Sequence, residues 1–82
     1  MKVYVTLRKR YEQPNEYKKL VLMATSGARV FELKRKVERE FSELFPNEPP
    51  FVVAKLEDEQ GFALSNSSQV AEVVQEGDKL IA

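Results

Sequence analysis

The stretch "TSGARVFELKRKVEREFSELFP", residues 25–46, decides the fold. Apolar side chains recur in it at steps of 3, 4, 4 and 3, at positions Val30, Leu33, Val37, Phe41 and Leu44. An α-helix has about 3.6 residues per turn, so this spacing places all five on one side of a helix. Pro46 follows the last of them and cannot continue the helical hydrogen bonding. The sequence therefore predicts one amphipathic helix with an apolar stripe that packs on a core.

The opposite side of this helix carries charges of both signs. Oppositely charged side chains stand four residues apart three times: Glu32 with Lys36, Lys34 with Glu38, and Lys36 with Glu40. Residues at this spacing are neighbours on a helix surface, and each such pair stabilises a helix by about 0.2–0.5 kcal/mol. We expect the three pairs to form on the solvent side.

Two strands are predicted before the helix. Apolar and polar residues alternate through "MKVYVTLRKR", residues 1–10, and the apolar set includes β-branched valines. Such alternation with a period of two is typical of a strand with one buried face. The segment "KKLVLMAT", residues 18–25, continues the pattern, and Pro14-Asn15 marks a turn between the two strands. A hairpin with a fairly long loop follows.

The residues after the helix predict a second hairpin and a closing strand. Strands are expected over residues 51–56 and 62–65, around a polar turn at residues 57–61. The segment "SNSSQVAEVV", residues 65–74, is expected to form a short helical turn, and "EGDKLIA", residues 76–82, a turn and a last strand. The predicted order is β-β-α-β-β-(short helical turn)-β, an α+β domain with a sheet packed on one helix.

Composition excludes several kinds of chemistry. The 82 residues contain no cysteine and no histidine, so thiolate and imidazole catalysis and ordinary zinc sites are excluded. The three glycines cannot form a phosphate-binding loop. We therefore expect no enzymatic activity, no metal and no cofactor. No apolar run is long enough to span a membrane and no signal peptide is visible, so an intracellular location, cytoplasmic or nuclear, is expected.

Charge is zero in total but uneven along the chain. Residues 1–41 carry a net charge of +6, and residues 42–82 carry −6. Such asymmetry steers partners of either sign, including a second copy of the domain. Zero net charge argues against nucleic acid, whose binding rewards many basic contacts.

Three stretches resemble the ubiquitin-like β-grasp family: "MKVYV" at the start, "VFELKRKV" in the helix, and "VAEVVQEGDKLIA" at the end. The resemblance covers essentially the whole chain. It implies a mixed sheet that curls around one helix, with the last strand parallel to the first. Conjugated members of the family end in a Gly-Gly tail, which this chain lacks. We therefore expect residues 1–82 to be a single, non-conjugated domain at the N-terminus of a longer protein.

Strand alternation predicts an apolar patch on the outer face of the sheet. In the second hairpin, Val52, Leu56, Phe62 and Leu64 are assigned inward because they are bulky and share one parity. The residues assigned outward are Tyr4, Val21, Met23, Phe51, Val53 and Ile81. The resemblance implies that this face binds protein partners, with Val53 near its centre. We therefore expect a protein–protein interaction module of an adaptor or scaffold protein.

Two alternatives remain open on the sequence. Phox-and-Bem-type β-grasp domains pair head to tail through an acidic hairpin and a basic strand. The corresponding charges here are Glu57, Asp58 and Glu59 on one side, and Lys2, Arg8, Lys9, Arg10, Lys18 and Lys19 on the other. The last third of the chain also resembles doublecortin domains, which bind a cytoskeletal polymer. Its basic surface would add Lys34, Arg35, Lys36 and Arg39.

Overall fold

The computed structural model describes residues 1–9 and 16–82. In chain order the elements are β1 (Lys2–Arg8), β2 (Glu16–Met23), α1 (Val30–Leu44), β3 (Glu57–Asp58), α2 (Val70–Val73) and β4 (Lys79–Ile81). Among the described residues, no helix has the length and apolar character needed to cross a membrane.

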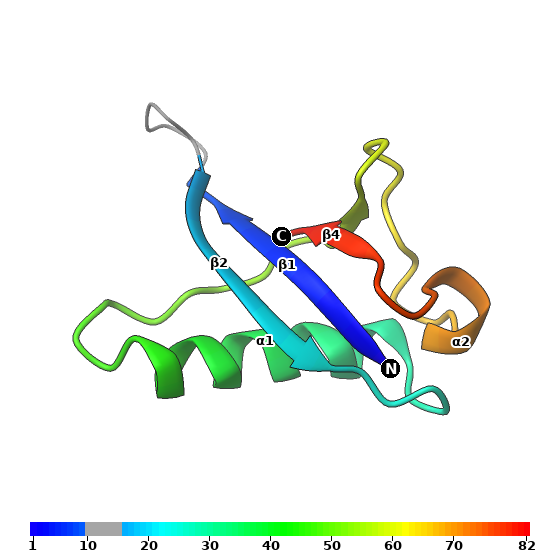
Figure 1. Cartoon of the computed structure of the whole chain (residues 1–82), viewed down its shortest axis with the longest axis horizontal. Helices are drawn as coiled ribbons and strands as arrows, with labels where there is room; N and C mark the ends of the chain where they lie inside the picture. The colour runs from blue at the N-terminus through cyan, green and yellow to red at the C-terminus, as the bar shows by residue number, and fades with distance from the viewer. Residues whose placement is uncertain (10–15) are drawn as a thin grey trace.

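The four strands form one mixed sheet in the order β2-β1-β4-β3. The central strand β1 runs antiparallel to β2 and parallel to β4, and β4 runs antiparallel to β3. Helix α1 lies across one face of this sheet, and the chain ends beside β1 (Figure 1). This is the predicted α+β arrangement, a mixed sheet packed on one helix with the last strand parallel to the first. The fold class and the position of the closing strand are therefore confirmed.

The core lies between the sheet and α1, where the alternation and the helical period placed it. Its members are at most 7% exposed, and those from the sheet and the helix are Val3, Val5, Leu7, Leu20, Leu22, Leu80, Val30, Leu33, Val37 and Phe41. The last residue of the predicted stripe differs, because Leu44 is 54% exposed. Phe45 takes its place: it leaves the helical conformation at φ −129° and packs on Phe41 with ring centres 5.2 Å apart.

The segment 51–56 is not the strand that the sequence predicts. The side chains of α1 bind its backbone: the Val53 N–H donates to Glu38 Oε2 at 2.8 Å, and Lys34 Nζ donates to the Ala54 carbonyl at 3.3 Å. Outside a pleated strand, alternate residues need not face opposite sides. Val53 is accordingly buried at 7% exposure and Val52 is 78% exposed, the reverse of the predicted orientation.

The second hairpin is reduced to β3 and a single bridge between Glu57 and Ala63. Phe62, predicted inward, is largely exposed. The turn is closed by Asp58, whose carboxylate accepts the N–H groups of Gln60 and Phe62, both at 3.0 Å. Gly61 follows with φ +92°, a conformation that favours glycine. The turn therefore forms where predicted, but the strands around it do not extend.

None of the three predicted ion pairs along α1 forms between these described residues. Four of the five charged side chains bind backbone groups instead. Besides the contacts of Lys34 and Glu38, Lys36 Nζ donates to the carbonyl of Met23, and Glu32 accepts the N–H of Arg29 at 3.2 Å. Backbone N–H and C=O groups outside strands and helices still require hydrogen-bond partners. The charged side chains of α1 provide such partners here.

Candidate functional site

Strand pairing places four apolar residues on the sheet face opposite α1. Tyr4 lies opposite Val21 on β2, Lys2 lies opposite Met23, and Thr6 lies opposite Ile81 on β4. Their neighbours Val5, Leu20 and Leu80 form the adjacent row and face the core. We call the four residues Tyr4, Val21, Met23 and Ile81 the sheet patch. Their predicted orientation is correct, and their role in binding stays a prediction.

The sheet patch is both accessible and apolar. Tyr4, Val21 and Met23 are 43%, 48% and 56% exposed, and Ile81 is half-buried. Because Tyr4 and Val21 are directly paired across the strands, their side chains are neighbours. Tyr4 and Val21 therefore present adjoining apolar surface at the centre of the patch.

Three lysines border this apolar surface, and Glu57 borders it where it is paired with Ile81. Lys2 is paired with Met23, and its ammonium lies 5.7 Å from the centre of the Tyr4 ring. Lys79 is paired with Tyr4 on the other side, and Lys19 with Thr6. A partner that brings apolar side chains flanked by carboxylates would complement such a surface in both respects.

Phe51 and Val53 do not belong to the sheet patch, contrary to the sequence prediction. Val53 is part of the core beside α1. Phe51 joins an aromatic cluster on the helix side, with its ring centre 5.6 Å from that of Phe41 and 6.3 Å from that of Tyr17. The cause is the path of segment 51–56, which follows the helix and does not add a strand to the sheet.

Sequence reasoning missed Tyr17 in this cluster. The register of β1 and β2 shifts between Leu7 and Arg8, whose partners are Lys18 and Glu16, so Tyr17 lies at the irregularity between these two pairs. A β-bulge of this kind breaks the alternation of faces. Tyr17 packs on Phe41 at 5.8 Å, and its hydroxyl donates to Glu48 at 2.6 Å. The alternation in the sequence carries no signal for this shift.

One residue of the predicted acidic pole and one of the predicted basic pole bind each other within the molecule. Glu57 accepts a hydrogen bond from Arg8 Nη2 at 2.8 Å, and Lys55 Nζ lies 3.1 Å from its other carboxylate oxygen. The hydrogen bond from Lys55 lowers the pKa of Glu57, partial burial opposes this, and Arg8 adds to the lowering. Head-to-tail pairing needs the two poles on separate surfaces, whereas Arg8 and Glu57 already bind each other.

The other charges of the two predicted poles are dispersed. Asp58 binds its own turn, and Glu59 is exposed. Lys9 lies over the Tyr17 ring at 4.0 Å, and Lys18 over the Phe45 ring at 4.9 Å. Lys2 and Lys19 belong to the rim of the sheet patch, and Arg10 lies outside the described residues. These residues therefore do not form two compact poles.

A pH-dependent contribution to stability is expected from Glu57. Its pKa is lower in the folded chain than in the unfolded chain, so ionised Glu57 stabilises the fold above the unfolded pKa. That contribution is lost as the pH falls through the folded pKa. Glu57→Gln should therefore lower the urea midpoint at pH 7 more than at pH 3. Glu59→Gln, at an exposed position of the same turn, is the control and should change neither midpoint. An equal effect of Glu57→Gln at both pH values would contradict this role.

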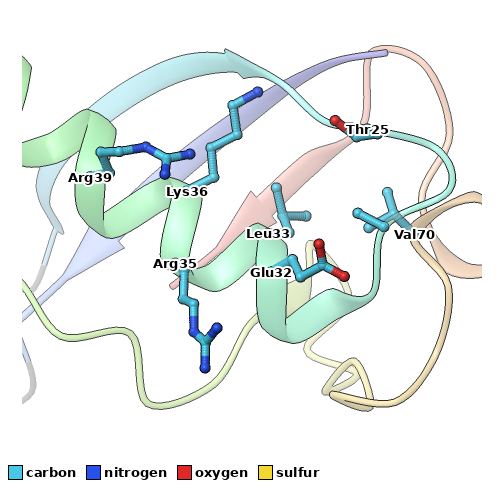
Figure 2. Close-up of a pocket in the computed structure, with 8 residues that line it drawn as sticks. Thr25, Glu32, Leu33, Arg35, Lys36, Arg39 and Val70 are labelled. Atoms are coloured by element: carbon cyan, nitrogen blue, oxygen red, sulfur yellow. The ribbon is translucent and has the colours of Figure 1, made fainter.

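A pocket of about 290 Å³ lies on the other side of the molecule, between α1, residues 25–28 and the start of α2 (Figure 2). It is lined by Thr25, Ala28, Glu32, Leu33, Arg35, Lys36, Arg39 and Val70. Three of these side chains are cationic and one is anionic. Within residues 1–9 and 16–82, no three His, Cys, Asp or Glu side chains are grouped as metal ligands.

The sheet order, the single packed helix and the parallel pairing of β1 with β4 define a ubiquitin-like β-grasp domain. The chain belongs to the family described as "Cdc14 phosphatase binding protein N-terminus", whose model matches residues 17–82. It is also similar in structure to a ubiquitin-like protein from the hyperthermophilic archaeon Caldiarchaeum subterraneum. The identity is 19% and the TM-score 0.46, over 99% of this chain and 91% of that one. None of the curated proteins matches significantly.

Proposed function

We propose that the domain is a non-catalytic protein-binding module of an adaptor or scaffold protein, and that it docks a Cdc14-type phosphatase on the sheet patch. Membership in a family described by phosphatase binding supports the class of partner. The surface is supported by one observation above all, which is that Tyr4, Val21 and Met23 are exposed side by side on the face opposite the helix.

The composition of the sheet patch suits a protein interface. Aromatic side chains and Met are enriched at the centres of interfaces, and a few such anchors carry most of the binding free energy. Here Tyr4 and Met23 are two such anchors. Val21 is paired with Tyr4 and stands two residues before Met23 on β2. Lys2, Lys19 and Lys79 beside the patch favour association with an acidic surface on the phosphatase.

A substitution at the centre of the sheet patch tests this proposal. Val21→Asp places a carboxylate among the apolar side chains, and docking would bury this charge without a partner, so we expect the affinity for a Cdc14-type phosphatase to fall by at least about tenfold. The domain should stay folded because Val21 is half-exposed and its backbone pairing does not depend on the side chain. Isothermal titration calorimetry measures the affinity, and circular dichroism measures the fold.

Val52→Asp is the matched control. It makes the same chemical change at an apolar residue that is 78% exposed but lies on the segment beside α1, away from the sheet patch. We expect it to bind the phosphatase with wild-type affinity. If Val52→Asp weakens binding as much as Val21→Asp, or if a folded Val21→Asp domain binds normally, the sheet patch is not the docking surface.

A further inference from the structure

We infer that the pocket between α1, residues 25–28 and α2 is an anion-binding site that takes the phosphate or carboxylate group of an acidic peptide. The site does not rest on the proposed function, because it shares no residue with the sheet patch. The chemistry of the lining identifies the ligand as a side chain that carries an anionic group next to an apolar part.

The walls of the pocket are held together by backbone hydrogen bonds. The N–H of Val70 donates to the Ala28 carbonyl at 2.8 Å, and the N–H of Ala71 donates to the Ser26 carbonyl at 3.2 Å. The floor consists of Leu33 and Val70, both buried in the core. A ligand therefore meets a site that is already formed and has little ordering entropy to lose.

Two cations reach into the same side of the pocket. In the view of Figure 2, Lys36 extends upward and Arg39 to the right, both above α1, whereas Arg35 extends downward. Lys36 donates one of its N–H groups to the Met23 carbonyl and keeps two more for a ligand. Within the described part of the chain, Arg39 makes no hydrogen bond or ion pair. The hydroxyl of Thr25 stands on the facing wall as a further donor (Figure 2).

Among the described residues, no acidic side chain forms an ion pair with Lys36 or Arg39. Glu32 is the acidic residue of the lining, and its carboxylate accepts the backbone N–H of Arg29 at 3.2 Å at the start of α1. Lys36 and Arg39 are three residues apart on one helix and repel each other at that spacing. An anion between them removes the repulsion and accepts charge-assisted hydrogen bonds from both.

The size of the pocket fits one side chain. A volume of about 290 Å³ accommodates a phosphorylated serine, or a carboxylate with its neighbour, and Leu33 and Val70 contact the apolar part. Lys and Arg together are a usual pair for phosphate, since the ammonium acts as a point charge and the guanidinium binds two oxygens.

Three short peptides of one sequence, differing at the centre, provide the probes. One carries phosphoserine, one carries serine, and one carries a run of aspartates. In an NMR titration of the labelled domain, we expect the phosphoserine or the aspartate peptide to shift the amide signals of Thr25, Leu33 and Arg39. The serine peptide should leave them unchanged. If the phosphoserine peptide binds more tightly, the site prefers a phosphate group. If the aspartate peptide binds more tightly, it prefers a carboxylate. If neither shifts these signals, the inference is overturned.

Variants of two cations of α1, Arg39 in the pocket and Lys34 outside it, distinguish binding at the pocket from non-specific charge attraction. Arg39→Gln should weaken the better anionic peptide by at least about tenfold, since it removes charge-assisted hydrogen bonds. Lys34→Gln makes the same charge change on the same helix at a residue that does not line the pocket, and should weaken it by less than about twofold at physiological salt. Equal weakening by both variants would overturn the site. Val21→Asp should leave the titration unchanged, so this inference and the sheet patch fail separately.

Discussion

Phe41→Ala is expected to lower the free energy of unfolding by about 3–5 kcal/mol, the range for truncating a fully buried aromatic residue. Phe41 has no exposed surface and lies at the centre of the aromatic cluster. Its ring centre is 5.2 Å from that of Phe45, 5.6 Å from that of Phe51 and 5.8 Å from that of Tyr17. The substitution therefore removes the ring contacts between α1 and both Tyr17 of β2 and Phe51 of segment 51–56.

Urea denaturation followed by circular dichroism measures this effect. The control is Phe62→Ala, which removes the same ring from a largely exposed position and should change the midpoint little. A similar loss of stability in both variants would contradict the placement of Phe41 at the centre of the core. In a domain of 82 residues, a loss at the upper end of the range leaves a large fraction of molecules unfolded.

Val53→Asp is expected to unfold the domain. Val53 is 7% exposed, and its N–H donates to the carboxylate of Glu38 at 2.8 Å. An aspartate there would place a second, unpaired carboxylate in a largely water-excluded position beside the first. Burying an unpaired charge costs several kcal/mol, and the like charge of Glu38 adds to this cost. The sequence alternation predicted the opposite, an outward side chain whose replacement would leave the fold intact.

A thermal melt distinguishes the two orientations of residues 52 and 53. Val52→Asp makes the same change one residue earlier, at 78% exposure, and should melt near the wild-type temperature. Val53→Asp should show no cooperative transition, or one at a much lower temperature. A cooperative melt of Val53→Asp alongside an unfolded Val52→Asp would restore the orientation that the sequence predicted.

The sequence predicts the fold correctly where apolar residues recur with a single clear period. In β1 and β2 the buried Val3, Val5 and Leu20 alternate with polar or exposed neighbours, so the face of each residue can be assigned. In α1 the spacing of Leu33 and Val37 selects one buried side in the same way. The parallel position of β4 was implied by the family resemblance, and the pairing of Val5 with Leu80 confirms it.

The errors in assigning buried and exposed side chains fall where adjacent residues are both apolar. In "FVVA", residues 51–54, either parity offers apolar side chains, so alternation cannot select the buried one. The selection is made by Glu38 and Lys34, which bind the backbone of this segment from a helix far away in the sequence. Leu44 and Phe45 present the same ambiguity, and the end of the helix settles it in favour of Phe45.

The same distinction decides which residues of the candidate sites could be predicted from the sequence. Tyr4, Val21 and Met23 could be assigned to the outer face because they lie on strands with clean alternation. The pocket could not be predicted, because Thr25, Lys36 and Val70 come from three segments that meet only in the fold. On the sequence, the basic residues of α1 are typical of a solvated helix face. The pairing of Arg8 with Glu57 was hidden for the same reason, since 49 residues separate them.

The most direct test of a docking face on the sheet is an NMR titration of the isotope-labelled domain with a Cdc14-type phosphatase. We expect the amide signals of Tyr4, Val21, Met23 and Ile81 to broaden or shift first. Signals of Val52 and of Ser42, an exposed residue of α1, should change least, because both lie on the helix side. Perturbation confined to α1 and segment 51–56, with the sheet patch unchanged, would contradict the proposed docking face.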